Sequence, residues 1–290
     1  MNFRTDLALE RCEFLGKKEL EGIEIEALET SGAKVTRIDV VNEKGAESVG
    51  KPIGRYVTVE VTPFAKHAHF IDESFETLAR EIGLLLPGSG SVLVAGLGNV
   101  KITPDALGPK CASMIFATRH ITRELLKATG FGNLRPVCSF PTGVLGETGA
   151  EAGELIKGAV QTLGIEAVIT IDALAARNAG RLGTTVQMCN TGIVPGSGVG
   201  NSRQEISEKT LGVPVIAIGV PTVVDAATLI LDYAGENAVE TDVLRRQESM
   251  MVTPREVDLM IERAAKLTSL AINCALQPEI SPEDMLMLTS

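Results

Sequence analysis

The sequence predicts an α/β protein: a three-layer helix–sheet–helix sandwich with a mostly parallel or mixed central sheet and a small N-terminal antiparallel β meander. Three observations predict this fold class. Residues 22–62 alternate between apolar and polar side chains, as half-buried strands do. Short apolar runs at 91–96, 166–171 and 213–218 are typical of strands buried on both faces. Amphipathic helical patterns alternate with these runs, which favours helices on both faces of the sheet.

The meander is expected from residues 37–40 and 56–61, where the alternation is clearest. Turns are expected at 43–45 and 52–54, because glycine and proline punctuate strands there. No internal repeat and no linker-like segment interrupts the chain, so residues 1–290 are expected to form a single domain.

Four helices are expected from apolar spacing and from their start and stop signals. They are a helix from about residue 70 to Leu86, one through Met114, Thr118, Ile121 and Leu125 that stops at Gly130, one from the capping box of Thr148 and Glu151 to Gly164, and a last long helix opened by Thr253, Pro254 and Glu256.

Composition argues against several function classes. The chain of 290 residues has a net charge of −10 and no basic block, so neither nucleic acid nor an anionic membrane is an expected partner. It shows no signal peptide and no apolar stretch long enough to span a bilayer, so a cytoplasmic location is expected. Its 5 cysteines form no C-x-x-C pair and are expected to be reduced thiols.

No cofactor or metal is expected from motifs. The run Gly96-Leu97-Gly98 resembles a dinucleotide-binding turn, but Lys101 stands where the third glycine belongs. The glycines are better explained by a tight turn that lets a substrate chain lie close to the backbone. His67 and His69 alone make a weak metal site.

Two aspartates follow predicted buried strands and are the candidate catalytic residues. Asp105 comes after Thr103-Pro104, where its ordinary role is an acid in the first turn of a helix. Asp172 directly follows an apolar strand, where an unpaired charge is costly. Arg177 is one candidate partner for Asp172 in a structural ion pair, and catalysis is the alternative.

Ligands collect beyond the carboxyl ends of strands in open α/β sheets. Adjacent strand ends would bring Asp105 and Asp172 together at that edge. Two carboxyl groups that lie close share one proton. The ionised member can then activate water while the protonated member donates to a carbonyl oxygen. That chemistry hydrolyses a peptide bond.

A glycine-rich loop at 190–201 is either a mobile surface connection or a segment that lines or gates the substrate site. Asp225 stands three residues after Thr222, so a helix-capping role is favoured for it. The residues expected to contact or gate substrate are Gly98, Asn99, Arg177, Pro195, Gly196, Ser197 and Gly198.

Several segments together resemble the germination protease family of spore-forming bacteria, and the likeness spans nearly the whole chain in order. They are residues 4–8, 54–58, 96–99, 103–110, 171–177, 195–201, 221–226 and 251–258.

The resemblance implies a homotetrameric endopeptidase of the spore core that degrades small acid-soluble spore proteins and is made as a zymogen. It assigns catalysis to Asp105 and Asp172, and it implies removal of a short leader, residues 1–6, by cleavage between Asp6 and Leu7. The related hydrogenase-maturation endopeptidases bind metal through acids at similar places, so a metal-dependent mechanism is an alternative. A non-catalytic anion-binding protein is a third. Longer family members carry an insertion before Met251 that this chain lacks.

Overall fold

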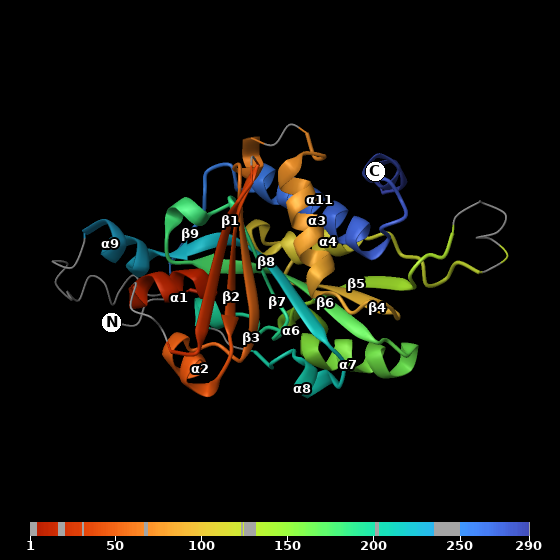
Figure 1. Ribbon diagram of the computed structural model, residues 1–290, viewed down its shortest axis with the longest axis horizontal. Helices are drawn as coiled ribbons and strands as arrows, with labels where there is room; N and C mark the ends of the chain where they lie inside the picture. Colours follow the sequence, from red (N-terminus) through yellow and green to blue (C-terminus); the bar gives the residue numbers. More distant parts are fainter. Residues whose placement is uncertain are drawn as a thin grey trace.

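The computed structural model describes residues 5–16, 21–30, 32–66, 69–122, 124, 132–200, 203–234 and 250–289. These residues build a nine-stranded mixed sheet with the strand order β1-β2-β3-β7-β8-β6-β4-β5, and β9 pairs with β8 (Figure 1). The strands are β1 (Ile23–Glu29), β2 (Ala33–Val40), β3 (Gly54–Val61), β4 (Val92–Leu97), β5 (Val137–Gly143), β6 (Ala167–Ala176), β7 (Thr185–Cys189), β8 (Val215–Asp225) and β9 (Met251–Val252).

Helices cover both faces of the sheet, so the predicted helix–sheet–helix sandwich is confirmed (Figure 1). One face packs against α3 (Glu73–Leu85), α4 (Leu107–Ser113) and α11 (Val257–Leu276). The opposite face packs against α7 (Ala152–Leu163), α1 (Ala8–Leu15) and α2 (Glu43–Val49). The other helices of the described residues are α6 (Leu145–Thr148), α8 (Glu208–Leu211), α9 (Ala226–Ala234), α12 (Pro282–Leu288) and the 3-10 turns η1 (Phe64–Lys66), η2 (Thr103–Asp105), η3 (Ala179–Arg181) and η4 (Ser197–Val199).

The strand β4 shows why a continuous apolar run forms the centre of this sheet. Val92 and Val94 pack in the core beneath α3, α4 and α11, whereas Leu93 and Ala95 pack with Ile156 of α7 on the other face. Successive side chains of a strand point to opposite faces. A strand that is covered on both sides therefore needs apolar residues at every position.

The sheet changes from parallel to antiparallel at β8. Strands β5, β4, β6 and β8 run parallel, whereas β7, β3, β2 and β1 follow in antiparallel pairs. The predicted N-terminal meander is confirmed, but β7 joins it to the parallel strands in one sheet. The turn predicted at 43–45 is instead the start of α2, because the Asn42 side chain caps that helix by accepting from the Gly45 N–H (3.0 Å).

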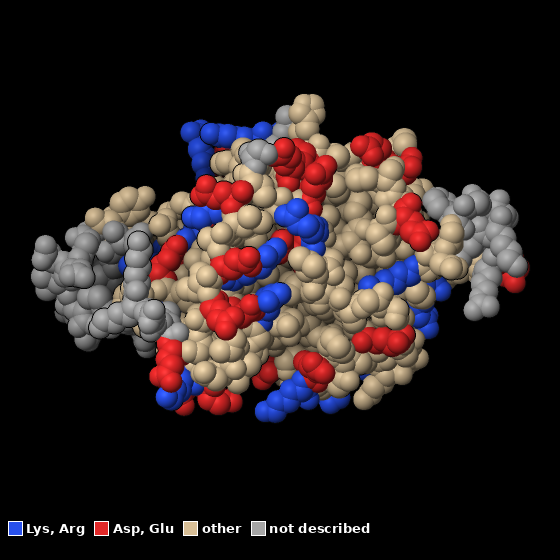
Figure 2. All heavy atoms as spheres, viewed as in Figure 1, with Lys and Arg blue, Asp and Glu red and all other residues tan. Residues whose placement is uncertain are grey.

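Ion pairs line the antiparallel end of the sheet. Arg37 of β2 contacts Glu26 of β1 (2.9 Å) and the buried Glu81 of α3 (2.7 Å), and Arg55 of β3 contacts Asp39 of β2 (2.7 Å). Figure 2 shows acidic and basic side chains interspersed over the face seen there. Paired charges near an edge strand discourage pairing with another chain.

A helix was predicted through Met114, Thr118, Ile121 and Leu125. It is absent over residues 114–122, whereas residue 124 is helical. The N–H of Thr118 donates instead to the carbonyl oxygen of Val137 in β5 (2.9 Å). Pairing with a strand has therefore overridden the helical spacing of the apolar residues. Leu125 and Gly130, also part of that prediction, lie outside the described residues.

Two other helices begin later than their capping patterns predict. In α7 the capping box consists of Glu151 and Glu154, while the Thr148 hydroxyl donates to the carbonyl oxygens of Val144 and Ala150. The helix α11 begins four residues after Thr253, whose hydroxyl donates to the carbonyl oxygen of Thr222 in β8 (2.9 Å). Each hydroxyl that was predicted to be a cap has another partner in the fold.

Candidate active site

Asp105 lies in η2, just after the end of β4, and a glycine makes room for it. Gly98 has a φ of +108°, and a Cβ at this position would lie 2.2 Å from the carbonyl oxygen of Asp105 and 3.0 Å from its Oδ1. The N–H of Asn99 donates to Asp105 Oδ2 (2.7 Å). The turn at Gly98 and Asn99 therefore fixes the position of the Asp105 carboxyl group.

A second glycine brings this segment against the neighbouring strand. A Cβ on Gly108, near the start of α4, would lie 2.2 Å from the carbonyl oxygen of Leu97 in β4 and 2.4 Å from that of Ile171 in β6. Only glycine allows so close an approach of helix and strand. Asp105 precedes Gly108 by three residues, and its turn η2 contacts β6. The charge of Asp105 acts on Asp172, the residue of β6 that follows Ile171.

Asp172 lies within β6, and the prediction that its strand ends at Ile171 is wrong. The strand continues to Ala176 because β6 pairs with β8 beyond this point, with Asp172 opposite Gly219. The last pair between β4 and β6, however, is Gly96 with Ile171. Asp172 is therefore the first residue of β6 beyond the β4 pairing, and its side chain is buried.

The negative charge of Asp105 affects the protonation of Asp172. The pKa of Asp172 is raised well above its ordinary value, first by burial, then by the negative charge of Asp105 and then by that of Asp6. A hydrogen bond from the N–H of Ala173 to Asp172 Oδ1 (2.9 Å) opposes this rise in pKa. Burial also raises the pKa of Asp105, and the bond from Asn99 opposes it.

This arrangement can supply both an acid and a base. Asp172 has the stronger reasons to keep its proton, whereas Asp105 accepts a hydrogen bond that favours its ionised form. Two carboxyl groups in unequal environments can divide general-acid and general-base work between them.

The N-terminal segment places a third carboxylate beside this pair. The N–H of Asp6 donates to the carbonyl oxygen of Ala175 in β6 (2.9 Å), and Asp6 Oδ2 accepts from the Ala175 N–H (2.9 Å). Asp6 Oδ1 accepts from the Ser197 hydroxyl (2.8 Å). A Cβ on Gly198 would lie 2.1 Å from Asp6 Oδ2. The segment around Asp6 therefore lies between β6 and the glycine-rich loop.

The glycine-rich loop has a defined shape over its described residues. Gly196 adopts a φ of +72° before the 3-10 turn η4, and the N–H of Arg203 donates to the carbonyl oxygen of Pro195 (2.9 Å). Of the four loop residues predicted to contact or gate substrate, Ser197 and Gly198 contact Asp6, while Pro195 and Gly196 shape the turn before them. Residue 201 lies outside the described residues.

Arg177 lies next to the N-terminal helix. Its guanidinium group lies over the ring of Phe14, 5.3 Å from the ring centre. Its backbone N–H donates to the buried Glu10 side chain (2.7 Å). Glu10 also accepts from the N–H of Asn178 (2.9 Å) and lies 3.5 Å from Arg181. Glu10 therefore anchors α1 to the end of β6, a role that no sequence pattern indicated.

Sequence reasoning also missed Lys51 and Gln187, which both contact the backbone of Asp6. Gln187 lies in β7, a strand of five residues without clear alternation, and Lys51 stands in a short connection. Neither residue could have been identified from the sequence without knowing which segments lie beside Asp6 in the fold. Asp225 caps a helix, but not in the predicted capping box with Thr222, which lies within β8. Asp225 is itself the residue before α9, and its Oδ2 accepts from the N–H of Thr228 (2.9 Å).

Across the described ranges, no group of three or more His, Cys, Asp or Glu side chains is arranged to hold a metal ion. Residue 67 of the predicted histidine pair lies outside the described residues. Within those same ranges, no helix combines the length and apolar character that crossing a bilayer requires.

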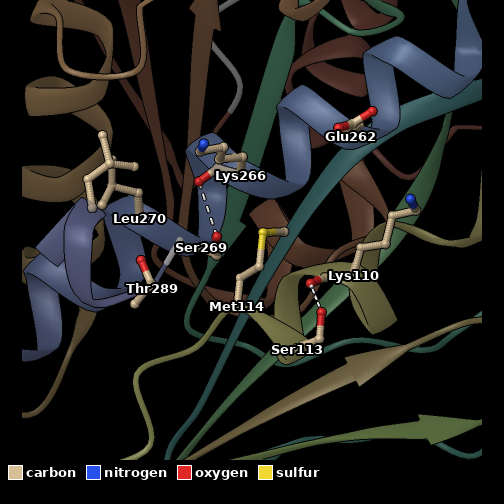
Figure 3. A pocket seen from close by; sticks show the side chains of 9 residues that line it. Lys110, Ser113, Met114, Glu262, Lys266, Ser269, Leu270 and Thr289 are labelled. Carbon is tan, nitrogen blue, oxygen red and sulfur yellow. Dashed lines mark hydrogen bonds between the residues drawn. The ribbon is translucent and has the colours of Figure 1, made fainter.

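A groove of about 420 Å³ lies between α4, α11 and α12, away from the aspartates (Figure 3). It is lined by Lys110, Ser113, Met114, Glu262, Lys266, Ser269, Leu270, Leu286 and Thr289. Neither Asp105 nor Asp172 contributes to its wall, so the groove is separate from the candidate active site.

Carboxyl groups of unequal pKa that lie together where one parallel strand ends beside its neighbour are typical of enzymes that use acid–base chemistry. The sequence profile of the Germination protease family matches residues 6–236. The chain belongs to the germination protease family. It is a germination-related endopeptidase, that is, a hydrolase that acts on peptide bonds.

Relatives called germination protease match nearly the whole chain. Those of Clostridium perfringens and Caldanaerobacter subterraneus are each 40% identical, over 98% of this chain and 98% and 97% of their own lengths. That of Priestia megaterium is 34% identical over an alignment of 354 residues, which covers 97% of this chain and 95% of the relative. Because that alignment is longer than this chain of 290 residues, the relative contains residues that this chain lacks.

Among solved structures, a [NiFe] hydrogenase maturation protease, HycI from Thermococcus kodakarensis, matches 63% of this chain and 98% of its own. The sequence identity is 14% and the TM-score is 0.33.

Proposed function

We propose that this endopeptidase cuts peptide bonds with water activated by Asp105 and Asp172. The observation that carries this proposal is the coupling of the two carboxyl groups: the charge of Asp105 raises the pKa of the buried Asp172. One group therefore remains protonated while the other ionises, which is the state that general acid–base hydrolysis needs.

The reaction follows from that division of protons. Asp105 takes a proton from water, whose oxygen bonds to the carbonyl carbon, and Asp172 gives its proton to the carbonyl oxygen. The resulting diol collapses when its C–N bond breaks. The leaving nitrogen takes the proton from Asp105, and one diol hydroxyl returns a proton to Asp172. Both carboxyl groups end in their starting states, so the cycle is complete.

We assign the substrate from the family. The proposed substrates are small acid-soluble spore proteins, whose degradation this enzyme begins in the spore core during germination. The proposed assembly is a homotetramer, each copy a single domain. The turn at Gly98 and Asn99, the loop at Pro195–Gly198 and Arg177 are the proposed substrate contacts. Ser197 and Gly198 contact Asp6 of the N-terminal segment, which supports the proposal that this loop contacts a substrate chain.

We propose that the chain is made as a zymogen and is processed between Asp6 and Leu7. The contacts of Asp6 with β6 and the glycine-rich loop support this, because they occupy the space beside the aspartate pair. Leu7 is fully buried against Leu174 and Val224. A bond beside so buried a residue is better placed for cleavage by its own active site than by a second enzyme. Residues 1–4 of the proposed leader lie outside the described residues.

The proposed function is tested by incubating the processed protein with a purified small acid-soluble spore protein, with and without a chelator, and measuring the products by mass. We expect cleavage at defined bonds with the same rate in both samples. Loss of activity in the chelator, restored by added metal, would favour the metal-dependent alternative. Absence of cleavage in both samples would refute the proposed substrate.

A further inference from the structure

The carbonyl oxygen of Asp6 receives two side-chain hydrogen bonds. Lys51 Nζ donates to it at 2.8 Å and Gln187 Nε2 donates at 3.1 Å. This oxygen belongs to the Asp6–Leu7 peptide bond, the bond at which processing is proposed. Two convergent side-chain donors on one carbonyl oxygen resemble the donor sets that stabilise the negative charge formed when a carbonyl is attacked.

Gln187 holds this peptide bond from both sides. While its Nε2 donates to the Asp6 carbonyl oxygen, its Oε1 accepts from the N–H of Ala8 (2.6 Å). Gln187 is buried, so its amide is held in place by the surrounding fold. All these contacts are to backbone atoms, and they would serve any peptide that followed the same path.

The sheet register places Gln187 in the same row as Asp172. Gln187 of β7 pairs with Gly219 of β8, and Gly219 pairs with Asp172 of β6. Paired residues of neighbouring strands point to the same face. Two strand spacings separate their backbones by about 10 Å, a gap that the two side chains and a peptide carbonyl between them can fill.

Lys51 reaches this oxygen from the connection between α2 and β3. The ammonium group lies in a partly buried site, and burial lowers the pKa of Lys51. The charges of Asp6 and Cys189 oppose this fall in pKa, whereas the charge of Arg11 adds to it. A cationic donor is stronger than a neutral one.

We infer that Lys51 and Gln187 form the site that binds the carbonyl oxygen of the bond being cut. This inference rests on the proposed function and deepens it. As water attacks, the electron pair of the C=O π bond moves to the carbonyl oxygen, which becomes negatively charged and then holds three lone pairs. Lys51 and Gln187 bind two of them, and the third takes the proton from Asp172. In the unprocessed chain the carbonyl of Asp6 occupies the site, and after processing a substrate carbonyl takes its place.

The test uses the variant Lys51→Met, which removes the donor, and Lys51→Arg, which keeps a cationic donor. Gln187→Glu removes the amide donor and keeps the acceptor for Ala8. Lys44→Met is the matched control, because Lys44 is an exposed lysine of α2 that pairs with Glu21. Each variant is prepared both as the full chain and with residues 1–6 omitted, so that self-processing and substrate cleavage are measured separately.

Steady-state cleavage of a small acid-soluble spore protein is then measured. We expect Lys51→Met to lower kcat by about 100-fold to 1000-fold, the effect of removing one such donor, with KM changed by less than about threefold. Lys51→Arg should recover part of the loss, and Lys44→Met should behave as the unmodified enzyme. The midpoint of thermal unfolding shows which variants fold. If Lys51→Met does not fold, Gln187→Glu takes its place in the test, with the same expected loss of kcat.

A folded Lys51→Met enzyme with unchanged kcat would overturn the inference while the activity of the unmodified chain upheld the proposed function. The inference would also fall if the variant slowed only self-processing, or if the whole loss lay in KM, because those results describe an anchor for the N-terminal segment. An unmodified chain that cleaves nothing would overturn the proposed function, and this inference with it.

Discussion

Replacing Gly98 by alanine is expected to lower both the activity and the stability of the enzyme. Gly98 has a φ of +108°, which alanine rarely adopts, and the added Cβ would lie 2.2 Å from the carbonyl oxygen of Asp105. Relieving that contact requires a shift of about 1 Å in the segment that carries Asp105, and a misplacement of that size can cost about 100-fold in rate. The unfavourable backbone conformation should lower the free energy of unfolding by about 1–3 kcal/mol.

The assay compares kcat on a small acid-soluble spore protein with the free energy of unfolding in urea. Gly83→Ala is the matched control, because Gly83 is an exposed helical residue of α3 and nothing lies within 4 Å of an added Cβ. We expect Gly83→Ala to keep full activity and to gain about 0.4–1 kcal/mol of stability. A Gly98→Ala enzyme that retained kcat within threefold of the unmodified enzyme would refute the claim that this turn fixes Asp105.

Two further predictions concern buried carboxyl groups. Because the fold raises the pKa of Asp172, the native state binds its proton more tightly than the unfolded state does, so stability falls as pH rises from the unfolded pKa of about 3.9 through the folded value. Asp172→Asn should therefore be more stable than the unmodified protein at pH 7, and the difference should shrink below about pH 4. Urea unfolding at both pH values measures this difference, and a variant as stable as the unmodified protein at each pH would contradict the prediction. Glu10→Ala should lower the free energy of unfolding by about 3 kcal/mol, because it leaves two backbone N–H groups and Arg181 without their buried partner. Glu13→Ala, which removes an exposed partner of Arg181, should cost less than about 1 kcal/mol by the same measurement, and similar losses in the two variants would exclude a special role for Glu10.

The sequence was sufficient to predict the parallel centre of the fold. Strands buried on both faces leave continuous apolar runs, so β4 and β6 could be recognised without knowing their neighbours. Once two such strands are adjacent and parallel, the acids that follow them must meet at one edge. This reasoning placed Asp105 beside Asp172, although Asp172 lies within β6 because β8 extends the pairing.

The rest of the site depended on contacts between distant parts of the chain. Asp6 reaches β6 through two hydrogen bonds to Ala175, one from its own N–H and one to its side-chain carboxylate. Both partner atoms belong to the backbone of Ala175, which leaves no trace in sequence. Gln187 gains its role from lying in register with Gly219 and Asp172, which is a property of strand order. The helix predicted through 114–122 failed for the same reason, because pairing to β5 outweighed local spacing.

The cleavage rates of Asp105→Asn and Asp172→Asn test the central claim most directly. Each variant keeps the size of the side chain but cannot exchange a carboxyl proton, and Asp258→Asn changes an exposed aspartate of α11 as the control. With a small acid-soluble spore protein as substrate, we expect both site variants to fold and to lose at least about 100-fold in kcat, while the control stays active. A folded variant of either Asp105 or Asp172 that cleaves at the unmodified rate would contradict the claim that these two carboxyl groups perform the hydrolysis.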